Sequence, residues 1–220
     1  GGTCNNVPKV DSISVFVANS PVVQYTSTKA EGCVPVEIGF LIPNYNPLFI
    51  YQWTYGDGNS EIFSGDKPRH LYEKSGCQNV SLKVISDFGC ISELTNNCMI
   101  NVYALPEVDF YYTPDQPTNL SPEVTFFSTT KNAVSWLWNI ANDDYYSDST
   151  FRNRFEEVGD YEVSLVVEDS NGCVDTAYKT ITVEYETVVF IPNAFTPNAD
   201  DLNSTFAPIG QGIAPENYEF

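Results

Sequence analysis

Two copies of one sequence module make up most of the chain, and this duplication constrains the fold more than any other feature. Residues 76–90 read GCQNVSLKVISDFGC and residues 159–173 read GDYEVSLVVEDSNGC, each position lying 83 residues after its counterpart. Two shorter pairs extend the match: YQWTYGDG (51–58) with WLWNIAND (136–143), and CVPVEIGF (33–40) with LSPEVTFF (120–127). A recurring unit of about 85 residues indicates tandem domains of one fold.

Apolar and polar residues alternate through short runs of each copy, the pattern of a half-buried strand. Val80, Leu82 and Val84 share one strand face, and the second copy repeats that face at 163, 165 and 167. Clusters of Gly, Pro, Asn and Asp separate the runs. We therefore expect an all-β fold of tandem immunoglobulin-like β-sandwiches, with Trp53 and Trp138 as buried anchors of the third strand in each copy.

Charge and composition exclude several classes of function. The chain has 10 Lys and Arg against 29 Asp and Glu, a formal net charge of -19, so nucleic acid and anionic lipid are not expected partners. No apolar run approaches the roughly 20 residues that span a bilayer, so no membrane-spanning segment is expected. With one histidine, His70, and no nucleophile or phosphate-binding motif, the sequence predicts a protein that is not an enzyme.

The first copy resembles the PKD domain, an immunoglobulin-like sandwich found in tandem on surface proteins and secreted enzymes. The resemblance lies in Trp53, the tripeptide Gly56-Asp57-Gly58, and then Pro68, His70 and Tyr72 before the strand that contains Val-Ser-Leu. It implies a PKD-like domain over residues 18–103. We interpret the Gly56-Asp57-Gly58 tripeptide first as a turn, because its glycines accept positive φ and its aspartate can bind nearby amides.

The second copy, residues 104–186, is a divergent member of the same pattern. Ala141-Asn142-Asp143 replaces the Gly-Asp-Gly turn, and Asn153 and Phe155 replace His70 and Tyr72. The copy carries Tyr161, which resembles a tyrosine corner, where the first copy has Gln78. Because each copy lacks part of the pattern, no function is assigned to the Gly-Asp-Gly turn or to His70.

A second resemblance covers VFIPNAFTPNADDLNSTFAPIG at residues 189–210. This segment is similar to the opening of the gliding-motility-associated C-terminal domain, the sorting module of Bacteroidetes proteins exported by the type IX secretion system. It implies that residues 187–220 begin a further β-rich sorting domain, that the secretion and attachment machinery is a partner, and that the protein is exported across the outer membrane to the cell surface. Residues 1–17 resemble the last strand of a preceding repeat.

Six cysteines allow 15 pairings. The first copy has Cys33 and Cys77, whereas the second has Leu120 and Asp160 at the matching positions, so we predict that these two cysteines are bonded. Cys90 and Cys98 flank the turn between the last two strands and are a second candidate pair. Cys4 and Cys173 then have no partner in their own modules. Zinc is disfavoured, because the chain has one histidine and no C-x-x-C pair.

Oxygen ligands gather near the end of the chain. Asn198, Asp200, Asp201 and Asn203 are candidate calcium ligands, although an Asx-rich turn explains the same residues without a metal. Asp143, Asp144 and Asp148 form a second acidic loop, which a solvated turn explains. Calcium is the only cofactor for which the sequence offers a candidate site.

Two functions remain open from the sequence. The first is a non-catalytic repeat region of a large gliding or attachment adhesin, whose distal surface or polysaccharide ligand is bound through upstream regions. The alternative is an ancillary PKD-like region of a secreted polysaccharide-degrading or proteolytic enzyme. An exposed planar strip formed by Tyr45, Tyr51, Tyr145 and Tyr146 would favour the alternative.

Overall fold

Every regular element in the described part of the chain is a β-strand, which confirms the predicted all-β class. The computed structural model describes residues 20–141, 144–190 and 209–211. The chain divides into two units, Gly1–Ala104 and Leu105–Phe220, so the boundary falls one residue after the expected one. In each unit two sheets form an immunoglobulin-like sandwich, and unit 2 has a further two-stranded sheet after its sandwich.

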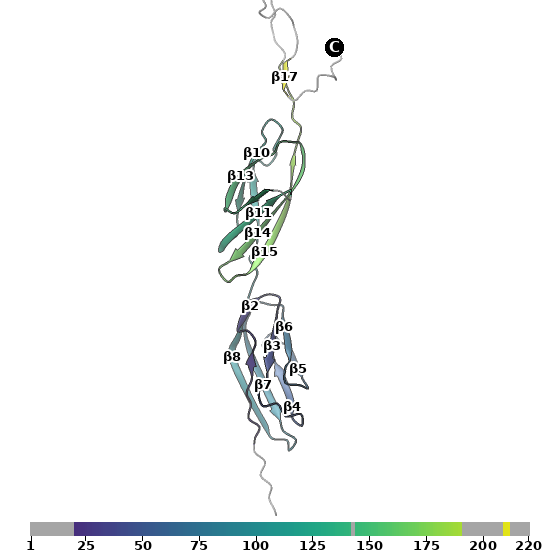
Figure 1. Ribbon diagram of the computed structural model, residues 1–220, viewed down its shortest axis with the longest axis vertical. Helices are drawn as coiled ribbons and strands as arrows, with labels where there is room; N and C mark the ends of the chain where they lie inside the picture. Colours follow the sequence, from purple (N-terminus) through teal and green to yellow (C-terminus); the bar gives the residue numbers. More distant parts are fainter. Residues whose placement is uncertain (1–19, 142–143, 191–208, 212–220) are drawn as a thin grey trace, which may run out of the picture. The chain divides into compact units, whose positions relative to one another are not determined.

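Unit 1 consists of a five-stranded sheet and a three-stranded sheet (Figure 1). The larger sheet has the order β2 (Glu31–Cys33), β8 (Ile91–Tyr103), β7 (Gly76–Ile85), β4 (Ile50–Thr54) and β5 (Ser60–Ile62). The smaller sheet has the order β1 (Thr26–Ser27), β3 (Val36–Leu41) and β6 (Arg69–Tyr72). Strand β2 pairs parallel to β8, whereas the other pairs in the unit are antiparallel.

Unit 2 repeats this arrangement with a four-stranded and a three-stranded sheet. The larger sheet has the order β12 (Asp144–Tyr146), β11 (Ala133–Ile140), β14 (Gly159–Asp169) and β15 (Val174–Val183). The smaller sheet has the order β13 (Thr150–Arg154), β10 (Glu123–Ser128) and β9 (Phe110–Thr113). Strands β14 and β15 therefore correspond to β7 and β8 of unit 1.

A fully buried tryptophan lies at the centre of each core. Trp53 contacts Tyr25 and Phe40, with ring centroids 5.0 and 5.2 Å away. Trp138 contacts Phe110 and Phe151, both at 5.0 Å. The alternating residues of β7 and β14 complete the two cores, as the period of two in the sequence predicts.

One detail of the repeat alignment is wrong. The alignment places Phe40 opposite Phe127, but Phe40 is buried in unit 1, and its buried counterpart in β10 is Phe126. Phe127 lies on the outer face, where its ring stacks on Tyr111 at 4.8 Å. A shift of one residue moves a strand's side chains to the other face of the sheet, and a similarity between short segments does not determine that register.

Residues 187–220 are described only in part. β16 (Val188–Phe190) pairs antiparallel with β17 (Ile209–Gln211) in a two-stranded sheet. The predicted strand of a preceding repeat at 1–17 lies outside the described residues. So do the four candidate calcium ligands, Asn198, Asp200, Asp201 and Asn203, and the calcium hypothesis stays a prediction.

Candidate functional site

The Gly-Asp-Gly segment of unit 1 is the turn between β4 and β5. Gly56 and Gly58 have φ of 93° and 99°, a conformation that favours glycine. A Cβ atom on Gly56 would lie 2.6 Å from the backbone nitrogen of Asn79 on β7, so the turn also needs a residue without a side chain there. The Asp57 carboxylate accepts hydrogen bonds from the backbone N–H and the side-chain amide of Asn59, at 3.0 and 2.9 Å.

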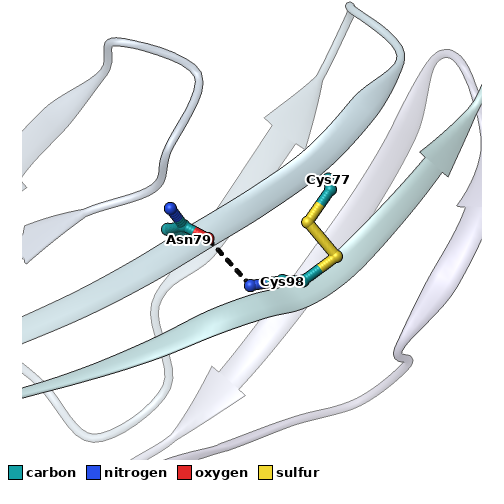
Figure 2. Close-up of a disulfide and its surroundings, with 3 residues drawn as sticks. All are labelled: Cys77, Asn79 and Cys98. Carbon is teal, nitrogen blue, oxygen red and sulfur yellow. Dashed lines mark hydrogen bonds between the residues drawn. A yellow bond between two sulfur atoms is a disulfide. The ribbon is translucent and has the colours of Figure 1, made fainter.

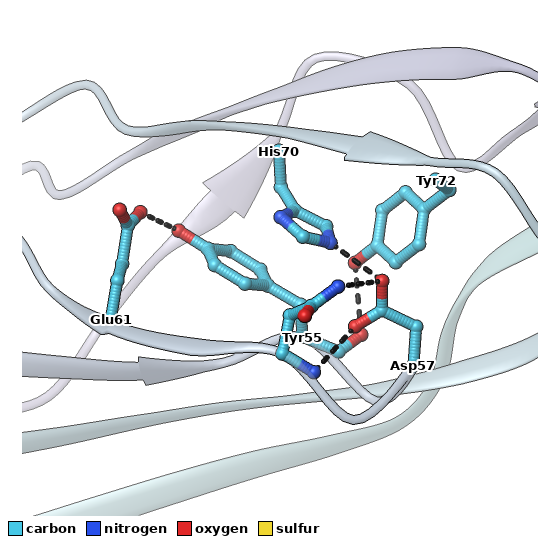
Figure 3. Close-up of polar contacts among 6 residues, drawn as sticks. Tyr55, Asp57, Glu61, His70 and Tyr72 are labelled. Atoms are coloured by element: carbon cyan, nitrogen blue, oxygen red, sulfur yellow. Dashed lines mark hydrogen bonds and ion pairs between the residues drawn. The ribbon is translucent and has the colours of Figure 1, made fainter.

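His70 connects this turn to the opposite sheet. Its Nε2 lies 2.8 Å from Oδ2 of Asp57 (Figure 3). The imidazole stacks on Tyr55 with ring centroids 4.0 Å apart and meets the ring of Tyr72 edge-on at 4.7 Å. Because β6 belongs to the three-stranded sheet and the turn to the five-stranded sheet, this contact holds the two layers together at one end of the sandwich.

Burial and hydrogen bonding set the charges in this cluster. Burial raises the pKa of Asp57, but hydrogen bonds from His70 and Asn59 outweigh burial and hold that pKa below its ordinary value. Burial also raises the pKa of Tyr55, whose hydroxyl donates to Glu61, and that of Tyr72, whose hydroxyl donates to the Tyr55 carbonyl at 3.0 Å. At neutral pH the cluster therefore contains an ionised Asp57 and two neutral tyrosines.

The His70–Asp57 pair is enclosed rather than presented to solvent. The two side chains are 14% and 8% exposed. Aromatic rings cover one face and an edge of the imidazole, so the pair lacks the open approach that a general base needs for its substrate. The geometry therefore supports the turn interpretation of Asp57 and gives His70 a structural role.

Unit 2 stabilises the same region with different residues. Asn153 takes the place of His70, and its side-chain oxygen accepts a 3.0 Å hydrogen bond from the hydroxyl of Tyr146. The indole N–H of Trp138 donates to the carbonyl of Asp148 at 2.8 Å. The hydroxyl of Tyr161 donates to the carbonyl of Glu157, four residues upstream, which is the geometry of a tyrosine corner.

The predicted pairing of Cys33 with Cys77 is wrong, because Cys77 is bonded to Cys98 (Figure 2). Strand β8 lies between β2, which carries Cys33, and β7, which carries Cys77. Two strand spacings separate their Cα atoms by at least about 9 Å, beyond the reach of about 7 Å that a disulfide allows. The candidate pair Cys90–Cys98 is also wrong, because Cys98 is bonded to Cys77.

A bulge in the β7–β8 hairpin brings the bonded cysteines together. The register passes from Gln78 opposite Ile100 to Val80 opposite Asn96, so residues 97–99 oppose a single β7 residue, Asn79. Cys98 has φ of 48°, and its N–H donates to Oδ1 of Asn79 at 2.8 Å (Figure 2). The Cα atoms of Cys77 and Cys98 are then 4.9 Å apart.

Two further cysteines are also oxidised. Cys33 at the end of β2 and Cys173 in the β14–β15 turn each take part in a disulfide bond. Disulfides persist in oxidising compartments, and they therefore indicate an extracellular or surface protein.

In each unit a segment that follows the first strand runs parallel to the C-terminal end of the sandwich and pairs with it. In unit 1, Glu31, Gly32 and Cys33 pair with residues 101–103, flanked by hydrogen bonds from Asn101 to the carbonyl of Ala30 and from residue 34 to that of residue 103. In unit 2, a single parallel bridge joins Thr118 to Glu184, flanked by hydrogen bonds from residue 119 to the carbonyl of 184 and from 184 to that of 117. Because the paired segments run in the same direction, opposite pulls on the two segments load their hydrogen bonds together.

The four tyrosines of the expected strip are not all exposed. Tyr51 is 2% exposed and its hydroxyl accepts the backbone N–H of Asn46. Tyr146 is half-buried against Phe151, and Tyr145 is 63% exposed. Because Tyr51 is buried, the four tyrosines do not form an exposed planar strip.

The described residues contain neither a metal-binding cluster nor a helix that could span a membrane. No group of three or more His, Cys, Asp or Glu residues in the described ranges is arranged to hold a metal ion. Over the same ranges, the structure contains no helix with the length and hydropathy of a membrane span.

Comparison with known proteins decides the family of the first unit. Residues 18–102 match the sequence profile of the PKD domain. Unit 1 is a PKD domain. Unit 2 follows it as a further immunoglobulin-like β-sandwich, and the match does not extend to residues 187–220.

Solved structures similar to this chain include two Vibrio PKD domains and a bacterial adhesin. The PKD1 domain of the Vibrio cholerae metalloprotease PrtV is 26% identical, over 36% of this chain and 98% of that chain, with a TM-score of 0.32. The PKD1 domain of Vibrio anguillarum Epp is also 26% identical, over 36% of this chain and 94% of that chain, with a TM-score of 0.32. A Ca²⁺-stabilised, ice-binding adhesin of an Antarctic bacterium is 10% identical, over 80% of this chain and 54% of that chain, with a TM-score of 0.44.

Proposed function

We propose that this chain is a non-catalytic repeat region of a bacterial cell-surface adhesin. In this proposal the PKD domain and the following sandwich hold a distal adhesive region away from the cell. Residues 187–220 address the protein to the type IX secretion and attachment machinery, which carries it across the outer membrane. The observation that carries the proposal is the recurrence of one sandwich, with its own tryptophan-centred core, in two successive units.

The parallel contacts support a mechanical role. When tension pulls on both ends of unit 1, the parallel pairing of β2 with β8 is loaded in shear and resists extension of the chain between them. The Cys77–Cys98 bond adds to this resistance, because residues between the two cysteines cannot be extended while it is intact. Both features suit a spacer that transmits force from a distal ligand to the cell.

The export part of the proposal rests on the resemblance of residues 189–210 to a sorting domain. Among the described residues, the sheet of β16 and β17 has two strands, so each strand has one edge that no other described strand pairs with. Such edges can accept an additional strand from a partner, which is one way for a secretion component to recognise this segment.

A truncation in the native host tests the proposal. Removing every residue after Glu186 keeps the contacts of Glu186 with Thr118 and Asn119, so both sandwiches should still melt cooperatively. The expected result is loss of surface delivery, measured by antibody labelling of intact cells, with the protein retained inside. Normal surface display of the truncated protein would overturn the export assignment.

The complete gene sequence tests the adhesin assignment separately. The proposal expects further repeats upstream of these units. A catalytic domain in that position would instead make the chain an ancillary region of a secreted enzyme.

A further inference from the structure

The outer face of the four-stranded sheet in unit 2 carries an unusual row of side chains. The strand registers place Tyr145 opposite Asn139, Asn139 opposite Ser164, and Ser164 opposite Tyr178. Their neighbours Trp138 and Leu165 are fully buried, so these four residues, on the alternate positions, point away from the core. Tyr145 and Tyr178 are 63% and 66% exposed, and Asn139 and Ser164 are partly exposed.

A second row lies beside the first on the same face. Leu137 is opposite Val166, and Val166 is opposite Thr176. Leu137 is 46% exposed, and the other two side chains are partly exposed. None of the seven side chains in the two rows is charged, although the chain as a whole has a formal net charge of -19.

The same positions in the PKD domain provide an internal comparison. There the first row is Ser60, Thr54, Ser81 and Thr95, which contains no aromatic residue. The second row is Ile62, Gln52, Lys83 and Glu93, which contains two charged residues. Two units with one fold therefore differ at this face, and unit 2 has tyrosines where unit 1 has small hydroxyl residues.

The chemistry of the face matches a neutral carbohydrate. Exposed tyrosine rings stack on the C–H faces of sugar rings, and the hydroxyls of Ser164 and Thr176 can exchange hydrogen bonds with sugar hydroxyls. An anionic polysaccharide would be repelled by the net charge, whereas a neutral one would not. The two tyrosines lie three strand spacings apart, about 14 Å, so a single monosaccharide cannot contact both.

From these observations we propose that the outer face of β12, β11, β14 and β15 binds a neutral, extended polysaccharide, with Tyr145 and Tyr178 stacking on separate sugar rings of one chain. This site is distinct from the distal adhesive region, and it does not depend on the export proposal, because an ancillary region of a secreted enzyme could use it equally. It would hold the repeat region itself against a polysaccharide layer.

Affinity electrophoresis of the whole chain tests the site. The probes are hydroxyethyl cellulose, glucomannan and xylan as neutral polysaccharides, with alginate as an anionic comparison. We expect retardation in at least one neutral gel and none in alginate. No retardation in any neutral gel, or retardation by alginate alone, would overturn the proposal.

Variants locate the binding face. Tyr145→Ala and Tyr178→Ala should each weaken binding by about tenfold, and because both side chains are exposed, the melting temperature should stay unchanged. The matched control is Tyr111→Ala, which removes a 52% exposed tyrosine from the opposite sheet of the same unit and should leave binding unchanged. Equal binding by wild type and both test variants, or loss only in the control, would place any site elsewhere.

Ligand length gives an independent readout that a general loss of stability would not produce. Calorimetric titration with oligosaccharides of increasing length, taken from the polysaccharide that binds, should show a rise in affinity at the length that reaches both tyrosines. Tyr178→Ala should abolish that rise. A steady affinity from disaccharide to hexasaccharide would contradict contact with two separated tyrosines.

Discussion

Removal of the Cys77–Cys98 bond should destabilise the PKD domain without affecting unit 2. Both cysteines are exposed, so the double variant Cys77→Ser/Cys98→Ser creates no core cavity. The main loss is then the constraint on the unfolded chain. For a sequence separation of 21 residues, the loop-entropy relation gives about 3 kcal/mol at 25 °C.

That free energy corresponds to a large shift in melting temperature. A domain of this size loses about 4 to 8 °C per kcal/mol, so the transition of unit 1 should fall by roughly 10 to 25 °C. Differential scanning calorimetry of the whole chain measures this directly, because the transition of unit 2 provides an internal reference. Cys90→Ser is the matched control, since it changes a cysteine of the same hairpin and keeps the Cys77–Cys98 bond.

Two results would refute the reasoning about this bond. One is a fall in melting temperature of only a few degrees in the double variant, which would mean that the disulfide adds little restriction to the unfolded chain. The other is a peptide map under non-reducing conditions that joins Cys77 to Cys33 instead.

Three further changes test the cores and the turn. In denaturant unfolding, Trp138→Phe should lower the free energy of unfolding by about 1 kcal/mol more than Trp53→Phe does. The Trp138 indole N–H donates to a backbone carbonyl, whereas the indole N–H of Trp53 is buried with no partner in the described structure. Equal losses for the two variants would contradict this. Gly56→Ala should lower the melting temperature of unit 1 more than Gly58→Ala, since both have positive φ but only a Cβ at 56 meets the β7 backbone; the reverse order would be inconsistent with this packing. Because the pKa of Asp57 is lower in the folded state, this residue contributes stability that is complete above its unfolded pKa near 4 and is lost as the pH falls through its folded pKa. Asp57→Asn should therefore make the stability of unit 1 depend less on pH in the acid range. An unchanged pH dependence would rule out this contribution.

The sequence was sufficient to predict features that depend on local periodicity. The alternation through 80–84 and 163–167 identifies strands and their buried faces, and the tryptophans in equivalent positions identify the two cores. These predictions succeed because burial of large apolar side chains dominates the energetics of a sandwich.

Features that depend on register could not be predicted in the same way. The Cys77–Cys98 bond requires a bulge opposite Asn79, and co-occurrence of cysteines in one repeat carries no information about which strand lies between them. The buried face of β10 depends on a shift of one residue. The contact of His70 with Asp57 joins opposite sheets, so the sequence indicated a turn at Asp57 but not its partner.

Single-molecule pulling of the whole chain tests the central claim, that two separately folded sandwiches form a spacer which resists tension. The measurement is made in reductant, so that every disulfide is open and each unit can extend fully. The account predicts two unfolding events, each releasing about 85 residues or roughly 300 Å of contour length. Unit 2, with one terminal bridge, should yield at lower force than unit 1, with three paired residues. A single combined event, or extension without a force peak, would contradict the account.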